Sequence, residues 1–101
     1  QVDEIFILYP NPYHKESQAN KRYHNMPFMG FLLTHLKSGG QLTLASNIES
    51  YVAEAEDRFV SDWDLSLKSK SEIPKNASPR TSFEKKYLDR GEKCINLVFE
   101  K

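Results

Sequence analysis

The chain has 101 residues, a length that favours one compact domain and is short for a complete cofactor-dependent enzyme. Fourteen basic and fourteen acidic side chains cancel, which excludes a globally basic nucleic-acid tether and leaves only local charged patches to consider. Cys94 is the single cysteine, so an intrachain disulfide and a cysteine-rich zinc site are excluded, and a reducing, cytoplasmic setting is expected. The longest apolar run, residues 5–9, is too short to cross a bilayer.

The first predicted element is a strand. Residues 5–9 form a continuous apolar, partly β-branched run that ends at Pro10, a pattern typical of a strand covered on both faces in a parallel sheet. Because this strand begins with no lead-in, we expect the chain to be a fragment of a larger domain. Pro10 and Pro12 make a rigid, non-helical exit from the strand, and the polar residues 14–24 predict a loop or a short irregular helix.

A helix and a strand are predicted next. Apolar residues recur at helical spacing over 28–36 after Pro27, a favourable first-turn residue, and Gly39 and Gly40 are expected to stop this helix. Alternation of apolar and polar residues then predicts a short strand over 41–45.

The following segment predicts the same pair of elements again. A single apolar stripe over 48–59 indicates a second helix. Ser46 is expected to cap its start, with Glu49 three residues later at the spacing of a capping box. Apolar and polar side chains alternate over residues 63–67, which predicts a third strand.

The last third of the chain predicts a long exposed connection over 68–82, a short helix over 83–90 that ends at Gly91, and a final strand over 94–99. The order of strands and helices indicates an open α/β sheet of parallel strands. Because the final two strands are joined without a full crossover helix, an antiparallel pair is expected at its edge.

Ligands of open α/β sheets bind beyond the carboxyl ends of the strands, so the residues just after each strand are candidates for a site. The prolines would hold the Asn11 amide and the Tyr13 ring in a fixed orientation that suits hydrogen bonding to a planar base and stacking on it. A plain proline-rich strand exit, with no role in binding, explains these residues as well. Asn47 follows the second strand and could equally help to cap a helix. Residues 80–84 complete the same rim.

The charged residues give two further interpretations. Lys15, Lys21 and Arg22 could contact phosphates or be ordinary solvated surface. Residues 68–90 hold seven basic and three acidic side chains, whereas residues 49–64 hold six acidic and one basic, a polarity that could orient an anionic polymer. The three histidines lack metal-ligand spacing, and no metal site is predicted.

Several short motifs resemble one known family, in order as well as in composition. They are Pro10-Asn11-Pro12-Tyr13, the stretch from His14-Lys15 to Lys21-Arg22, Leu36-Lys37-Ser38-Gly39-Gly40, Ser46-Asn47 and Thr81-Ser82-Phe83-Glu84. Over almost the whole chain they resemble the carboxyl-terminal half of the bacterial tRNA (guanine-N7-)-methyltransferases, in which the matching motifs include Pro-Asp-Pro-Trp, Leu-Lys-Pro-Gly-Gly, Thr-Asp and Thr-x-Phe-Glu. The Gly-Gly turn is common to many methyltransferases, whereas Thr-x-Phe-Glu is much more specific.

The resemblance implies the carboxyl-terminal half of a Rossmann-like class I methyltransferase sheet, with parallel strands and an antiparallel edge strand. It also implies S-adenosylmethionine as cofactor, tRNA as substrate and no membrane. Asn11 takes the place of the family's catalytic aspartate beside the cofactor, with Tyr13 as a second cofactor contact. Lys21 and Arg22 would contact RNA phosphates. The implied substrate contacts are Lys15, Asn47, Thr81, Ser82, Phe83 and Glu84.

Two departures from the family pattern bear on activity, because both rim aspartates are asparagine here, at Asn11 and Asn47. Losing a carboxylate about 4 Å from a positive charge could cost about 4 kcal/mol at an effective dielectric constant near 20, or roughly a thousandfold in rate. Glu84 could still supply a carboxylate. The alternatives are a non-catalytic RNA-binding or scaffold protein, and an exocyclic-amine methyltransferase, whose Asn-Pro-Pro-Tyr motif residues 11–13 partly match.

The fragment itself is expected to behave differently from a whole enzyme. The glycine-rich cofactor loop and the acidic ribose-binding residue of a class I methyltransferase are absent from these residues, so the isolated chain should be inactive and should bind S-adenosylmethionine poorly. The exposed edge strand at residues 5–9 predicts a homodimer or a domain-swapped assembly.

Overall fold

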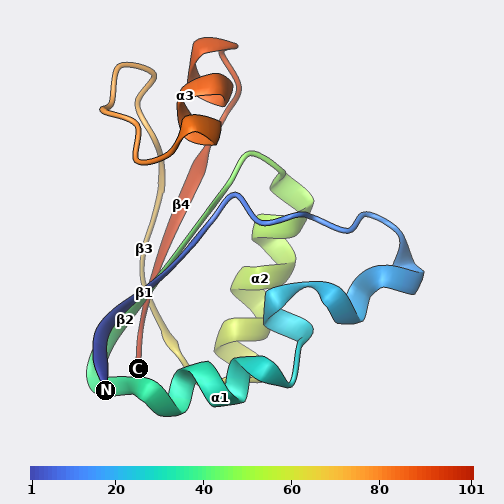
Figure 1. Ribbon diagram of the computed structural model, residues 1–101, viewed down its shortest axis with the longest axis vertical. Coiled ribbons are helices and arrows are strands. Elements are labelled where there is room, and N and C mark those ends of the chain that lie inside the picture. Colours follow the sequence, from blue (N-terminus) through green and yellow to red (C-terminus); the bar gives the residue numbers. More distant parts are fainter.

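A computed structural model describes all residues from 1 to 101 and shows a four-stranded mixed sheet with helices packed around it (Figure 1). The strand order is β1-β2-β4-β3, in which β1 and β2 are parallel and β4 is antiparallel to both of its neighbours. None of the helices is long and apolar enough to cross a membrane. The elements are β1 (Val2–Leu8), the 3-10 helices η1 (Glu16–Lys21) and η2 (Tyr23–Asn25), α1 (Phe28–His35), β2 (Leu36–Ser46), α2 (Glu49–Ser61), β3 (Ser66–Glu72), α3 (Ser82–Asp89) and β4 (Ile95–Glu100).

The predicted α/β sheet is therefore confirmed, and its expected antiparallel edge pair is formed by β3 and β4. Within this pair the reversed strand β4 is the inner one, and β3 lies at the edge of the sheet. Strand β1 forms the opposite edge. Its Phe6 side chain is 52% exposed, so in this chain the prediction that β1 is covered on both faces is wrong.

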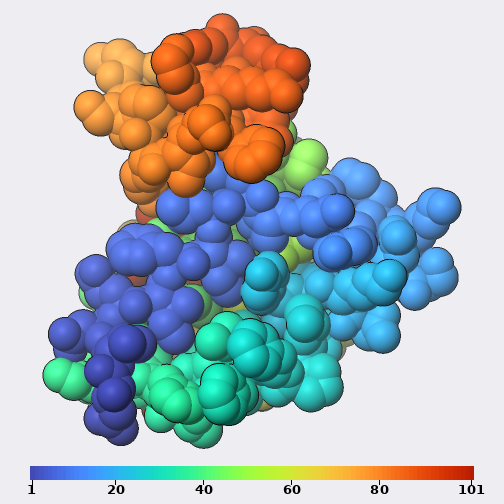
Figure 2. All heavy atoms as spheres, in the orientation of Figure 1, coloured from blue at the N-terminus to red at the C-terminus, as the bar shows by residue number.

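The main core lies between the central strands and helix α2. Leu44 of β2 and Leu97 of β4 are fully buried against Phe59 of α2, and burial of each such side chain stabilises the fold by roughly 1.5–3 kcal/mol. Successive strand residues point to opposite faces, so Ala45 lies on the other face from Leu44. There it joins a second, smaller cluster that includes Leu88 of α3. The segment around α3 forms a separate lobe at one end of the molecule, orange in Figure 2.

The two glycines expected to stop the first helix lie instead inside a strand. Helix α1 ends at His35 and β2 begins at Leu36, so Gly39 and Gly40 belong to β2. A Cβ atom on Gly40 would lie 2.9 Å from the backbone oxygen of Asp3, and Gly39 has a left-handed φ of 81°. Gly40 allows the close approach of β1 and β2, next to which the register shifts between Val2 and Glu4, and Gly39 allows the left-handed backbone turn within β2.

Two other predictions of local structure are corrected. The capping box is wrong, because Ile48 caps α2 without a side-chain hydrogen bond and Ser46 Oγ accepts from the Ile48 amide at 3.0 Å. Strand β3 extends to Glu72, into the segment expected to be an exposed connection. Its polar sequence is tolerated because β3 is an edge strand, and its pairing with β4 fixes its conformation.

Candidate functional site

The backbone that leaves β1 is strained. Tyr9 and Tyr13 have φ angles of 55° and 45°, in the left-handed region that non-glycine residues adopt at a cost of roughly 1–2 kcal/mol each. The two prolines lie between them, and the Asn11 Oδ1 atom accepts a hydrogen bond from the Tyr13 amide at 3.0 Å. Such a conformation persists only where the surrounding structure holds it, and it often occurs at functional sites.

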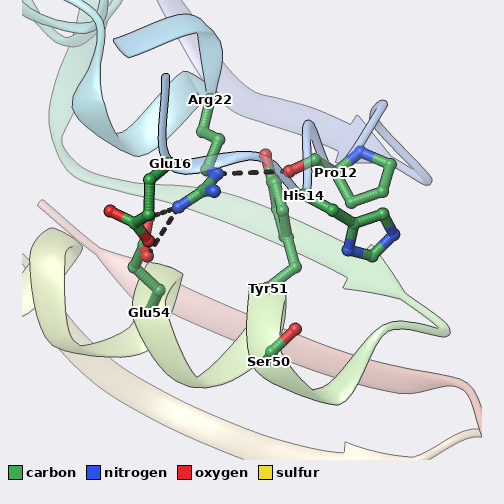
Figure 3. A pocket seen from close by; sticks show the side chains of 7 residues that line it. All are labelled: Pro12, His14, Glu16, Arg22, Ser50, Tyr51 and Glu54. Atoms are coloured by element: carbon green, nitrogen blue, oxygen red, sulfur yellow. Dashed lines mark hydrogen bonds and ion pairs between the residues drawn. The ribbon is translucent and has the colours of Figure 1, made fainter. Parts of the chain in front are cut away.

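Arg22 supplies that restraint. Its side chain is buried, and its guanidinium donates a hydrogen bond to the backbone oxygen of Pro12 at 3.2 Å (Figure 3). It also donates to the backbone oxygen of Tyr13 at 2.8 Å, with a longer hydrogen bond to that of Lys15. The same group forms an ion pair with Glu54 of α2 at 2.8 Å. The guanidinium donors are therefore engaged within the chain. Of the two side chains expected to contact phosphates, Lys21 is the exposed one.

Glu54 is the centre of a wider polar network. Besides Arg22, its Oε1 atom accepts from the Nε2–H of His24 at 2.7 Å and from the Asn25 amide at 2.9 Å. Burial alone would raise the pKa of Glu54, but the hydrogen bonds from His24, Arg22 and Asn25 lower it to about 2. Burial lowers the pKa of His24, which favours the neutral ring, and the Glu54 carboxylate that faces Nε2 favours the tautomer with its proton on that nitrogen.

A small cavity of about 160 Å³ lies between this network and the strained loop. In Figure 3, Tyr51 reaches from α2 toward the loop, with Pro12 and His14 on one side of its ring and Arg22 on the other. The Tyr51 hydroxyl is buried and has no hydrogen-bond partner. The cavity is smaller than the roughly 300–1,000 Å³ typical of pockets that enclose a drug-sized ligand.

The second part of the rim is the start of α3. Thr81 caps this helix, and its Oγ1 atom accepts from the Glu84 amide at 3.0 Å. The Glu84 carboxylate is almost completely buried and accepts hydrogen bonds from the amide and guanidinium of Arg80 and from the Tyr9 hydroxyl. Burial opposes its ionisation, yet the hydrogen bonds from Arg80 and Tyr9 lower the pKa of Glu84 to about 2. Ser82 and Phe83 are exposed beside it.

The structure brings some of the predicted site residues together and leaves others apart. The Tyr9–Glu84 hydrogen bond joins the exit of β1 to the start of α3. Asn47, which follows β2, donates its Nδ2 group to Glu92 at 2.8 Å. Asn11 makes no bond to either of these groups, and its only side-chain hydrogen bond is the local one within its loop.

Several residues that organise this rim were missed by the sequence analysis. Residues 80–84 were expected on the rim, but the ion pair between Arg80 and Glu84 was not, although their spacing of four residues predicts one. Glu54 and His24 gave no signal, because their partners are about thirty residues away in the sequence. Tyr9 was assigned to the strand, and its hydroxyl gave no reason to expect a partner in α3.

The comparisons with known proteins cover the whole chain. A family described as "Putative methyltransferase" matches residues 1–97. Among the similar curated proteins are three named tRNA (guanine-N(7)-)-methyltransferase: one from Ralstonia pickettii, 32% identical over 101 residues, one from Burkholderia mallei at 30% and one from Neisseria gonorrhoeae at 31%. Each alignment covers 99% of this chain but only 39%, 38% and 42% of the respective relative. The chain thus spans about two fifths of the length of these proteins.

Proposed function

The chain belongs to this methyltransferase family, and from that membership we propose that it is the substrate-side part of an S-adenosylmethionine-dependent tRNA (guanine-N7) methyltransferase. The observation that carries the proposal is the match over the full chain to relatives of that name. The rim geometry supports it, because the Tyr9–Glu84 hydrogen bond joins the residue just before Pro10-Asn11-Pro12-Tyr13 to the last residue of Thr81-Ser82-Phe83-Glu84. We place the activity in the cytoplasm, in keeping with the single free cysteine, Cys94.

The reaction needs little acid–base catalysis from the protein. Guanine N7 carries a free lone pair, so catalysis consists mainly of positioning the base and stabilising the positive charge that develops on it. Asn11 uses its Oδ1 atom within the loop, which leaves its Nδ2 group free to donate to a guanine oxygen. Asn47 has the opposite arrangement, because its Nδ2 group is engaged by Glu92 and its Oδ1 atom is free to accept from a guanine amino group.

The remaining proposed contacts surround these two amides. Lys15 is exposed and is proposed to contact the substrate backbone, while Ser82 and Phe83 present an exposed hydroxyl and ring at the start of α3. Thr81 and Glu84 are engaged within the chain, so their proposed contribution is to hold this segment in place.

The residues present do not form a pocket for the methyl donor by themselves. Class I methyltransferases hold the donor with a glycine-rich loop, whereas the glycines here have other roles: Gly30 lies against the Trp63 ring and Gly40 against backbone, and Gly39 and Gly91 adopt positive φ angles. No glycine lines any cavity of the chain. When bound, the donor supplies the methyl group, and we propose that Asn11 and Tyr13 border it. The isolated 101 residues should bind S-adenosylmethionine more weakly than micromolar, which calorimetry would test.

The decisive experiment uses the full-length gene product. Labelled methyl transfer from S-adenosylmethionine to bulk tRNA is measured, and the product nucleosides are analysed. Label in 7-methylguanosine is the expected result. Unlabelled tRNA, with the donor still bound, would overturn the substrate assignment, and label in an exocyclic amino group would favour the amino-methyltransferase alternative.

A second test concerns the two rim asparagines. Because a carboxylate stabilises a nearby positive charge by up to about 4 kcal/mol, Asn11→Asp together with Asn47→Asp should raise the methyl-transfer rate by up to roughly a thousandfold. Asn76→Asp is the control, because the Asn76 side chain is exposed and is not one of the proposed substrate contacts, and it should change nothing.

A non-catalytic RNA-binding role is the second candidate, and one observation favours it. Both rim aspartates of the family are amides here, and the Glu84 carboxylate is neutralised by Arg80. If the two Asn→Asp substitutions produce no methyl transfer while tRNA is still bound, the binding role is the better account.

We also propose that the isolated chain self-associates through β1. This strand has a hydrogen-bonded neighbour on one side only, and Val2 and Phe6 are exposed on it. A dimer or a domain-swapped assembly is expected, and a monomeric mass by light scattering would contradict it.

A further inference from the structure

The guanidinium of Arg22 has no donor left for a substrate. Its Nε atom donates to the backbone oxygens of Pro12 at 3.2 Å and Tyr13 at 3.0 Å. Its Nη2 atom donates to the backbone oxygens of Tyr13 and Lys15, and its Nη1 atom donates to both carboxylate oxygens of Glu54. These bonds use the whole set of guanidinium N–H groups, and the side chain that carries them is buried.

The adjacent cation, Lys21, is in the opposite state. Its side chain is exposed, and its Nζ atom lies 5.9 Å from the centre of the Tyr13 ring. The resemblance implies that Lys21 and Arg22 both contact RNA phosphates. The structure separates the two residues, because Lys21 is accessible to a phosphate and Arg22 is not.

Glu54, which accepts from Arg22, is itself held from the core. Its Oε1 atom accepts from His24 at 2.7 Å. The His24 side chain is buried, with its ring edge-on to that of Tyr51 at 4.9 Å, and its backbone oxygen accepts from the Trp63 indole at 2.8 Å. A continuous series of contacts therefore runs from the core through Glu54 to Arg22 and the strained loop.

At its other end this series reaches a proposed substrate contact. Tyr13 has a left-handed φ of 45°, and its backbone oxygen accepts two hydrogen bonds from Arg22. The amide of the same residue donates to the Asn11 Oδ1 atom at 3.0 Å. Because a carboxamide is planar, fixing Oδ1 also fixes the direction in which Nδ2 can donate. The orientation of the Asn11 amide thus depends on Arg22 through one intervening residue.

From these contacts we propose that Arg22 and Glu54 are positioning residues for methyl transfer, and that Arg22 makes no contact with RNA. Arg22 holds the loop so that the Asn11 amide keeps its orientation toward the guanine, and Glu54 holds Arg22. This role rests on the proposed function and replaces the one that the resemblance implies for Arg22. It requires the planar fork of an arginine, because the point charge of a lysine cannot reach a carboxylate and three backbone oxygens at once.

The test measures kcat and the KM for tRNA of the full-length protein carrying Arg22→Lys or Glu54→Gln, at saturating S-adenosylmethionine. Because a misplacement of about 1 Å can cost about a hundredfold in rate, kcat should fall by up to about a hundredfold while KM stays unchanged. A phosphate contact predicts the opposite for Arg22→Lys, since the positive charge is kept. Rates are expressed per molecule that binds tRNA in a titration, so that unfolded protein is not counted.

Two controls separate positioning from a loss of stability. Leu97→Ala removes a fully buried side chain of β4 that takes no part in the polar network, and it lowers stability through a cavity. Glu56→Gln removes a carboxylate from the same helix as Glu54, where its ion pair with Lys70 is accessible. Both controls should keep the kcat of the wild type.

Amide hydrogen exchange tests the holding of the loop without turnover. Exchange in residues 10–22 should be faster in Glu54→Gln than in the wild type, whereas exchange in residues 82–89 of α3 should not change. Equal exchange of the loop in the two proteins would overturn the proposal.

Three kinetic outcomes would also overturn it. They are a wild-type kcat in Arg22→Lys, a raised KM with an unchanged kcat in that variant, and a fall of kcat in Leu97→Ala as large as in Glu54→Gln. Absence of methyl transfer by the wild type would contradict the proposed function alone, because hydrogen exchange still shows whether Glu54 and Arg22 hold the loop.

Discussion

The two segments that form the rim are each anchored by one arginine–glutamate pair, but the burial of the two partners is reversed. In the loop after β1 the arginine is buried and the glutamate is accessible: the Arg22 side chain is 8% exposed and Glu54 33%. At the start of α3 the Arg80 side chain is 33% exposed and Glu84 only 1%. A buried guanidinium cannot lose its proton, whereas a buried carboxylate can gain one. The buried Arg22 therefore needs a negatively charged partner at every accessible pH. The buried Glu84, if its partner is lost, can instead become neutral by protonation.

The largest expected effect comes from removing the accessible partner of the buried arginine. Glu54→Gln leaves the Arg22 charge in place, with backbone oxygens as its remaining acceptors, and also weakens the bonds from His24 and Asn25. Breaking a buried pair costs roughly 3–5 kcal/mol, and since Glu54 is partly solvated we expect about 3 kcal/mol, measured by urea unfolding at neutral pH.

The pH dependence of that loss has a definite sign. The pKa of Glu54 is lowered to about 2 in the folded state, so its contribution is present above the ordinary pKa of a glutamate and is lost as pH falls toward 2. The difference between wild type and Glu54→Gln should shrink over that acidic range only. Glu56→Gln is the control on the same helix, because its ion pair with Lys70 is solvent-accessible, and it should change stability by less than about 1 kcal/mol. Equal losses of stability in the two variants would show that the pair of Arg22 and Glu54 does not anchor the loop.

The second expected effect is a reversal in how the stability of the fold changes with pH. Arg80→Ala leaves Glu84 buried with only the Tyr9 hydroxyl as a side-chain partner, so the pKa of Glu84 should rise above its ordinary value in the variant. Between that ordinary value and the raised one the variant becomes less stable as pH increases. The wild type, in which the pKa is about 2, instead becomes less stable as pH decreases below the ordinary value.

We expect Arg80→Ala to cost about 2 kcal/mol at neutral pH, less than Glu54→Gln, because protonation limits the penalty. Thermal unfolding across a pH series measures it. Arg58→Ala breaks an accessible pair with Asp62 at the same spacing of four residues and should show a small loss with no change of slope. A parallel response of the Arg58 and Arg80 variants would mean that Glu84 is not held by the charge of Arg80.

The same comparison shows which parts of the site a sequence can reveal. The start of α3 is predictable, because Thr81 and Glu84 have cap spacing and Arg80 precedes Glu84 by one helical turn. The loop anchor is not, since Arg22 and Glu54 are 32 residues apart and meet only after η1 and α2 have packed. In the sequence, Lys21 and Arg22 are adjacent basic residues, and nothing there distinguishes the buried side chain from the exposed one. Both therefore fit the pattern of phosphate contacts.

The fold divides in a similar way. The order of strands and helices follows from periodicity, and all four strands and three α-helices lie near their predicted places. The errors arise where a distant segment decides the local structure. Gly40 lies in a strand because the backbone of Asp3 passes close to it, and β3 extends to Glu72 because β4 pairs with it despite its polar sequence.

The smallest of the three effects concerns the contact that joins the two segments. Burial and the hydrogen bond to Glu84 raise the pKa of Tyr9, so its hydroxyl stays protonated and donates. Tyr9→Phe removes one hydrogen bond to a charged group, worth about 1.5 kcal/mol, and should move the acid unfolding midpoint upward because Glu84 loses a donor that lowers its pKa. Tyr87→Phe is the matched control: its ring lies 5.4 Å from that of Tyr9, and its hydroxyl makes no hydrogen bond. If both variants unfold at the same pH and temperature, packing of these rings, and not the hydroxyl, holds the two segments together.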